Sequence, residues 1–298
     1  MSRNPILTDK AFDEAGSGGV AVAGGASPAD EWQQAQNAQA AQAGAFQMGQ
    51  QSQMPTGPVV TDGKVMTLGG VASATLVMFA FLLFGGFFGW QMVDVVRAGV
   101  DASGETVYNP SFSSPVLLFV SMFAGLGLAI LTSFKPKLAK FTGVAYALCE
   151  GFLLGAISAY YGALYQGIVA QAVLATAGVF LVMLILYGLR ILRATPKFVK
   201  GVIAATFGIF FMYMAMFIVN LFGVGQSFWT SGSPFGIIIS LVVVGVAALN
   251  LILDFDFIEK GVQRGLPRYM DWYAGFGLIV TLVWLYLEML RLLARLRQ

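Results

Sequence analysis

The chain has 298 residues, of which 57% are apolar and only 11% are charged, whereas soluble domains usually carry about 25% charged residues. Its formal net charge of +2 is small and gives no indication of nucleic-acid binding. The single cysteine, Cys149, excludes an intrachain disulfide. The absence of histidine excludes histidine-ligated metal and Ser-His or Cys-His catalytic pairs. We expect no cofactor, no metal site and no enzymatic activity.

Residues 1–64 differ in composition from the rest of the chain. They are rich in alanine, glutamine and glycine, and a Gln/Ala-rich tract runs from Trp32 to Gln53. Such a segment cannot bury enough apolar surface to offset its chain entropy. We predict a disordered cytosolic tail over residues 1–64, followed by a transmembrane domain over residues 65–298.

Seven hydrophobic runs follow Lys64, and breakers or charged residues bound each of them. A helix needs about 20 mostly apolar residues to cross about 30 Å of hydrocarbon. Backbone groups in lipid must bond within their own segment, and the runs are too long and continuous for barrel strands. The sequence therefore predicts an all-α membrane protein with seven transmembrane helices. The runs lie near residues 68–93, 115–134, 141–163, 168–189, 199–222, 234–254 and 271–291.

Basic residues are distributed unevenly between the two sides of this arrangement. If the N-terminus is cytosolic, the outer loops carry only Arg97. Enrichment of Lys and Arg in inner segments is typical of membrane proteins, so we predict a cytoplasmic N-terminus. Seven crossings then place the C-terminus outside, although it carries Arg291, Arg295 and Arg297. Either the last helix does not fully cross, or its basic end lies in the outer headgroups. The inner basic residues are Arg3, Lys10, Lys64, Lys135, Lys137, Lys140, Arg190, Arg193, Lys197, Lys200, Lys260, Arg264 and Arg268.

Small residues recur at every fourth position of the third span. Residues four apart lie on one face of a helix, and a stripe of small residues lets two helix backbones touch in the membrane. We interpret this stripe as a helix-packing seam rather than a ligand site. It consists of Gly143, Ala147, Gly151, Gly155 and Ala159.

Four acidic residues lie in or beside the spans, where a carboxylate costs on the order of 2.5–3.5 kcal/mol and suggests a function. Asp254 and Asp256 close the sixth span, and each is either a residue of the water boundary or a functional acid. Glu288 lies late in the seventh span, where it either pairs with Arg291 or Arg295 at the outer surface or acts in function; residues three apart on a helix share a face. Glu150 has no basic residue within two turns. It is therefore either protonated and hydrogen-bonded to another helix, or it lines a water path.

These acids are candidates for an ion pathway or a pH gate. A buried carboxyl without a positive partner favours its neutral form, and two such groups can share a proton. Neutral carboxyls hold helices together, whereas ionised ones repel each other or attract a cation. Oxygen ligands also suit hard cations such as calcium.

Three segments resemble the Bax inhibitor family of transmembrane proteins, which has bacterial YccA-like members. Segment 284–293 (WLYLEMLRLL) resembles the family's final helix, which typically reads Leu-Tyr-Leu-Asp before apolar residues. Segment 253–258 (LDFDFI) resembles the end of its sixth helix, and segment 146–158 (YALCEGFLLGAIS) resembles its Gly-rich third helix. The resemblance covers about residues 66–298 and excludes the tail.

The resemblance implies a seven-helix bundle whose last helix is enclosed by the other six. It implies a pH-sensitive cation leak, chiefly for calcium, gated by a carboxylate pair that would be Asp254 and Glu288. The chain departs from the family pattern in having Glu288 in place of the usual aspartate and a long loop from Glu259 to Met270. Glu288 also lies 17 residues after Asp271, or about 25 Å along a helix. If Asp254 and Glu288 do not meet, Glu150 remains a partner for Glu288, and Asp271 for Asp254.

Two functions follow as hypotheses. The first is a pH-sensitive cation leak channel in the bacterial inner membrane, with the lipid bilayer and cations, calcium among them, as partners. The second is a non-transporting regulator that binds a membrane protease or another membrane protein, for which the long polar tail is suited. Neither involves nucleic acid.

Overall fold

The computed structural model describes residues 65–100, 106–221 and 234–298, so the prediction for the tail of residues 1–64 lies outside the described residues. Within these ranges, seven helices are long and apolar enough to cross a membrane, as the sequence predicts. They are α3 (Leu68–Trp90), α4 (Pro115–Phe134), α5 (Ala139–Leu164), α6 (Ile168–Gly188), α7 (Pro196–Leu221), α9 (Pro234–Gln263) and α10 (Tyr269–Leu296).

Local sequence signals set where the helices begin. Prolines open α4, α7 and α9, where the missing N–H is one that a first helical turn leaves without an intrahelical partner. Thr67 caps α3, because its side chain accepts a hydrogen bond from the Gly70 N–H at 2.9 Å. A short 3-10 turn, η1 (Pro136–Leu138), joins α4 to α5.

The prediction that the sixth helix ends at residue 254 is wrong. Helix α9 continues to Gln263, which also makes the following loop much shorter than the sequence analysis indicates. The charged residues of this extension find partners inside or beside the helix. Lys260 Nζ lies 2.6 Å from Asp256 Oδ2, and the Tyr187 hydroxyl donates to Glu259. A run of charges therefore does not end this helix.

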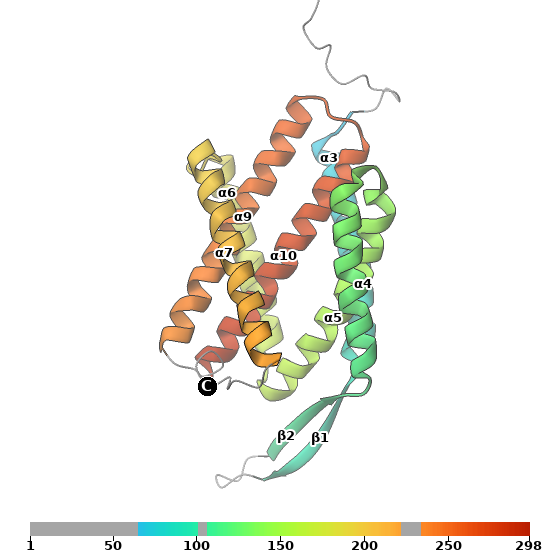
Figure 1. The fold of residues 1–298 in the computed structure, drawn as a ribbon, viewed down its shortest axis with the longest axis vertical. Coiled ribbons are helices and arrows are strands. Elements are labelled where there is room, and N and C mark those ends of the chain that lie inside the picture. The colour runs from blue at the N-terminus through green and yellow to red at the C-terminus, as the bar shows by residue number, and fades with distance from the viewer. Residues whose placement is uncertain (1–64, 101–105, 222–233) are drawn as a thin grey trace, which may run out of the picture. The chain divides into compact units, whose positions relative to one another are not determined.

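A β-hairpin follows α3, where the sequence analysis places only a loop. Strands β1 (Val93–Val100) and β2 (Thr106–Phe112) pair antiparallel and extend beyond the helices (Figure 1). Valine-rich segments favour extended structure. The valines of β1 are therefore a signal for a strand, but a search for apolar runs long enough to span a membrane does not detect it. The hairpin is attached to α5, where the ring of Phe112 stacks on Tyr160 with centroids 5.4 Å apart.

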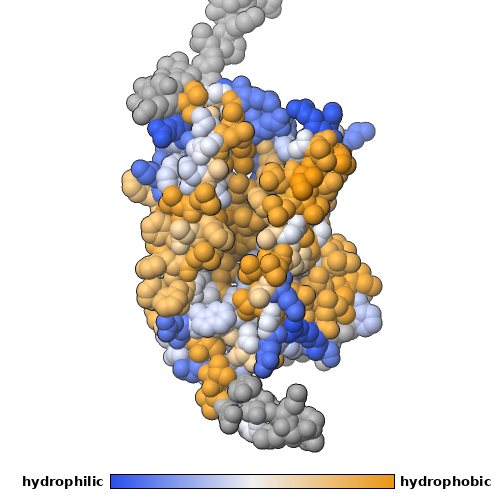
Figure 2. All heavy atoms as spheres, turned by 180° about the vertical axis from the view of Figure 1, so that it is seen from behind, coloured by the Kyte–Doolittle hydropathy of each residue, from blue (hydrophilic) through white to orange (hydrophobic). Residues whose placement is uncertain are grey.

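Helix α10 is the central helix of the bundle (Figure 1). It packs against α3, α5, α6 and α9 and contributes to both buried hydrophobic clusters of the bundle. Helix α4 packs on α5 at the periphery. Apolar side chains gather around the middle of the bundle, and polar ones lie at its two ends (Figure 2). This distribution is what a hydrocarbon layer with water on both sides requires.

Helices α3 and α5 approach each other through glycines. A Cβ at Gly151 would collide with the Leu82 carbonyl oxygen, and one at Gly155 with the Gly86 carbonyl oxygen. The other members of the stripe on α5 also face inward, since a Cβ at Gly143 would lie 3.2 Å from Met78 Sδ. The stripe of small residues thus lies directly against α3, and close backbone contact of this kind holds helices together in lipid.

Candidate functional site

Asp254 lies in the ninth position before the end of α9 rather than at the helix end. Its carboxyl faces α10, where a Cβ at Gly277 would lie 3.6 Å from Oδ1, and it interacts with Thr281 one turn further on. Its Oδ2 atom is buried and has no hydrogen-bond partner among the described residues. One turn before Asp254, Asn250 Nδ2 donates to Thr206 Oγ1 of α7 at 2.9 Å. Two polar contacts one turn apart on α9 thus reach α7 and α10 inside the span.

Glu288 is only 2% exposed and is fully partnered. Arg291 Nη1 lies 3.0 Å from both of its carboxylate oxygens. The Tyr213 hydroxyl of α7 donates to Oε1 at 2.9 Å, and the guanidinium lies over the Tyr213 ring, 5.0 Å from its centroid. The Glu288–Arg291 spacing could be read from the sequence, whereas Tyr213 belongs to another helix and has no signal there.

The structure does not bring Asp254 and Glu288 together. Among the described residues, no hydrogen bond or ion pair joins them: Asp254 faces Gly277 and Thr281, whereas Glu288 binds Arg291 and Tyr213. Thr281 and Glu288 are seven residues apart on α10, which is about 10 Å of helix rise. The carboxylate pair that the family resemblance implies is therefore absent from this arrangement.

The other acids also lie apart from Asp254. Glu150 of α5 is half-buried and faces α4, where a Cβ at Gly125 would lie 3.2 Å from its Oε2. Asp271 accepts a hydrogen bond from the Thr67 backbone N–H at 3.0 Å. Asp256 is paired with Lys260. Neither of the alternative pairings, Glu150 with Glu288 or Asp271 with Asp254, is present among the described residues.

Replacing Tyr213 with phenylalanine should lower the free energy of unfolding by about 1.5–3 kcal/mol, the usual contribution of hydrogen bonds to charged groups. The change removes the hydroxyl that bridges Glu288 and Arg291 and keeps the ring. Unfolding of purified protein in mixed micelles measures the effect. Tyr165→Phe is the control, because that hydroxyl accepts only a 3.5 Å bond from exposed Gln298. Equal stability of the two variants would contradict a structural role for the Tyr213 hydroxyl.

The basic end of α10 is bound to neighbouring helices. Arg295 Nη1 donates to the Gly236 carbonyl oxygen at 2.6 Å, and Arg297 donates to the Gln166 carbonyl oxygen and to Gln171 Oε1, both at 2.7 Å. Helix α10 ends beside the hairpin, at the end of the bundle opposite the start of α3 (Figure 1). Its arginines therefore have partners at that end, and the helix has the length of a full crossing.

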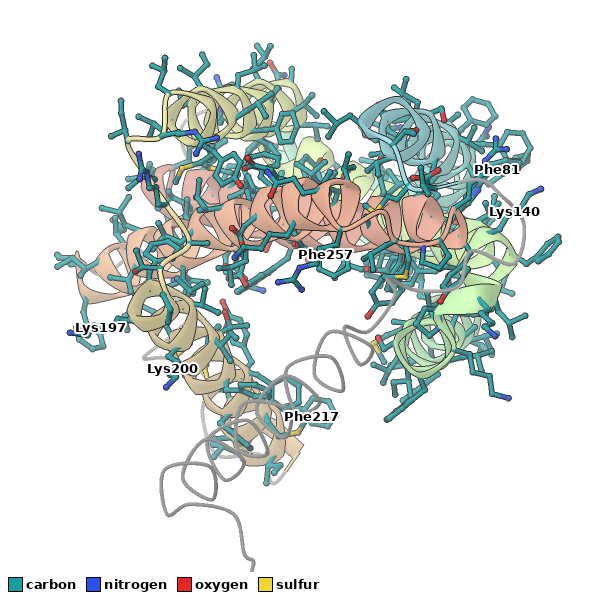
Figure 3. All side chains as sticks on the ribbon, turned by 90° about the horizontal axis from the view of Figure 1, so that it is seen from above. Phe81, Lys140, Lys197, Lys200, Phe217 and Phe257 are labelled. Carbon is teal, nitrogen blue, oxygen red and sulfur yellow. The ribbon has the colours of Figure 1, made fainter. Side chains whose placement is uncertain are left out.

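The opposite end carries the lysines and arginines of the helix connections. Lys140, Lys197 and Lys200 lie at this end, around the periphery of the bundle (Figure 3). Within the described ranges, no group of three or more cysteine or acidic side chains is placed to hold a metal ion. The described residues therefore provide one acid with a buried, unpaired oxygen, Asp254, and one acid whose charge is compensated, Glu288.

The family model described as Bax inhibitor 1 like matches residues 25–298 of the chain. The matched range includes the seven membrane-spanning helices and the acids Glu150, Asp254, Asp256, Asp271 and Glu288. No curated protein matches the chain.

Proposed function

The chain belongs to the Bax inhibitor 1 like family, and from this membership we propose that it is a pH-sensitive cation leak pathway of the cell membrane, with calcium as the expected cation. The observation that supports this proposal is Asp254 Oδ2, a buried carboxylate oxygen without a hydrogen-bond partner inside a membrane-spanning helix. Such a group is costly when ionised and alone, so it takes up either a proton or a cation.

In this proposal Asp254 is the titrating group. Protonated, it is neutral and allows α9 to pack on α10 at Gly277 and Thr281. Ionised, it offers an oxygen ligand of the kind that hard cations prefer, beside the polar groups of Thr281 and Asn250. Glu288 does not share this role, because Arg291 already compensates its charge. It fixes α7 to α10 through Tyr213.

Orientation and catalysis are further parts of the proposal. We place the N-terminal end of α3 on the cytoplasmic side of a bacterial inner membrane, because that end of the bundle carries the basic connections. We also propose that the protein is not an enzyme, since the chain has no histidine and its buried acids lie apart from one another.

Calcium flux into dye-loaded proteoliposomes between pH 6 and pH 8 tests the proposal. The parent flux should change with pH. Asp254→Asn should give, at every pH, the flux that the parent shows at the acidic end, because the amide resembles the protonated carboxyl and cannot ionise. Asp256→Asn is the matched control: it removes an acid two residues away that is paired with Lys260, and it should keep the pH dependence. A pH dependence that survives in Asp254→Asn would place the sensor elsewhere.

The second candidate is a non-transporting regulator that binds a membrane protease or another membrane protein. The observation that favours it is the attachment of the segment that follows the tail. Met66 is 1% exposed and its N–H donates to the Leu266 carbonyl oxygen at 2.7 Å, and Val65 forms a β-bridge with Pro267. The chain thus enters the bundle beside the α9–α10 connection. Absence of flux above empty liposomes at every pH would favour this function over the leak.

A further inference from the structure

An apolar groove lies between α3 and α6 on the face opposite to that of Figure 1. Its volume is about 730 Å³, within the range of about 300–1,000 Å³ usual for small-molecule sites. Seen along the helices, α3 and α6 stand apart on the same side of the bundle (Figure 3), and that face is hollowed between two apolar ridges (Figure 2). Leu83 of α3 and Val173 of α6 line its walls, and Leu282 and Tyr286 of α10 line its floor.

The hydroxyl groups that line the groove are already hydrogen-bonded within the protein. The Ser158 and Tyr286 hydroxyls in its lining bond to each other at 2.7 Å. The Thr176 hydroxyl donates to the Ala172 carbonyl oxygen of its own helix at 2.8 Å. The remaining lining is aliphatic, aromatic or glycine. Because these hydroxyls are already bonded within the protein, the groove is suited to a hydrocarbon chain.

A second cavity continues the groove towards the hairpin. It has a volume of about 480 Å³ and shares Phe87 and Trp90 with the groove, and its lining adds Gln91 and Val93. Tryptophan at the end of a span marks the boundary between hydrocarbon and headgroups. The two cavities together therefore offer an apolar channel that ends beside Trp90 and Gln91, at the level expected for headgroups.

We propose that the groove binds one acyl chain of a membrane phospholipid, with the headgroup in the cavity beside Gln91 and the hairpin. The groove is walled by helices that span the membrane and opens sideways, so hydrocarbon chains are the medium in contact with it. Its floor belongs to the central helix α10, so a bound chain would reach side chains that lipid on the outer surface does not touch. Leu282 and Tyr286 of α10, for example, are half-buried and line the groove.

Photolabelling in vesicles tests this proposal independently of ion flux. The full chain is placed in phosphatidylcholine vesicles that contain a phosphatidylcholine with a diazirine on its acyl chain, and the labelled residues are mapped by mass spectrometry. Label is expected on Leu282 or Tyr286 of α10 as well as on outward residues such as Leu174, which is 72% exposed. Label confined to outward residues would overturn the proposal.

Filling the groove provides the matched comparison. Ala177→Trp places a ring into the groove lining and should lower α10 labelling by about tenfold, because overfilling a packed space excludes a ligand. Leu174→Trp places the same ring on the same helix outside the groove and should leave that labelling unchanged. Val173→Trp is a second filling variant in case the first folds poorly. Equal α10 labelling in parent and both filling variants would overturn the assignment. So would disulfide-linked dimers through Val173→Cys in a Cys149→Ala background, because the occupant would then be a second copy.

Discussion

Leucine at position 155 is expected to prevent the bundle from assembling. A Cβ at Gly155 already collides with the Gly86 carbonyl oxygen, and leucine adds three further carbons to the same contact. Overfilling a core with side-chain neighbours costs about 1–3 kcal/mol. At position 155 the colliding atom belongs to the backbone of α3, which cannot change rotamer as a side chain can. We therefore expect the free energy of unfolding to fall by more than about 3 kcal/mol. The yield of monodisperse protein after detergent extraction and its thermal unfolding measure this loss.

Gly178→Leu is the matched control for Gly155→Leu. It makes the same change on α6, where nothing lies within 4 Å of an added Cβ and the position is exposed. We expect this variant to be extracted and to unfold like the parent. Normal yield and stability of Gly155→Leu would show that α3 and α5 do not pack through their glycines.

Replacing Arg291 with methionine should destabilise the protein by about 3 kcal/mol, the lower end of the usual cost of removing one partner of a buried ion pair, because the Arg291 side chain is itself 37% exposed. The change leaves Glu288, 2% exposed, with only the Tyr213 hydroxyl as a partner. Methionine keeps most of the length of the arginine stem, so the effect reports the lost charge more than lost packing. Unfolding in mixed micelles provides the measurement.

A second substitution separates charge from packing in this prediction. Adding Glu288→Gln to Arg291→Met removes the uncompensated charge and should restore most of the lost stability. Arg190→Met serves as the control, because Arg190 pairs with Glu259 at 3.5 Å in an exposed position, and exposed pairs contribute only about 0–1 kcal/mol. If Arg291→Met costs no more than Arg190→Met, the Glu288–Arg291 pair has no special structural role.

The number of helices could be predicted from the sequence because hydrocarbon thickness imposes a minimum length on every span. The stripe of small residues could also be identified from the sequence, because residues four apart lie on the same face of a helix. The end of α9 could not, because the pairing of Asp256 with Lys260 and of Glu259 with Tyr187 removes the cost of charge that hydropathy alone assigns.

The surroundings of the acidic side chains could be predicted only in part from the sequence. Whether Asp254 faces lipid, water or α10 depends on the rotation of α9 about its axis, which packing against Gly277 and Thr281 determines. The partner of Glu288 on its own helix follows from spacing, but Tyr213 lies 75 residues away and reaches it only after α7 has packed. Contacts between helices are a property of the assembled bundle, whereas contacts within a helix are a property of the chain.

The central place of α10 also imposes an order on biosynthesis. The ribosome completes the other six helices before α10, yet four of them, α3, α5, α6 and α9, pack against the position that α10 later occupies. Until α10 enters, Tyr213 of α7, Ser158 of α5 and Asp254 of α9 lack the neighbours that α10 supplies. The earlier helices are therefore in the membrane before the two buried hydrophobic clusters are complete. This interval is when a chaperone or an insertase component has access to surfaces that the finished protein hides.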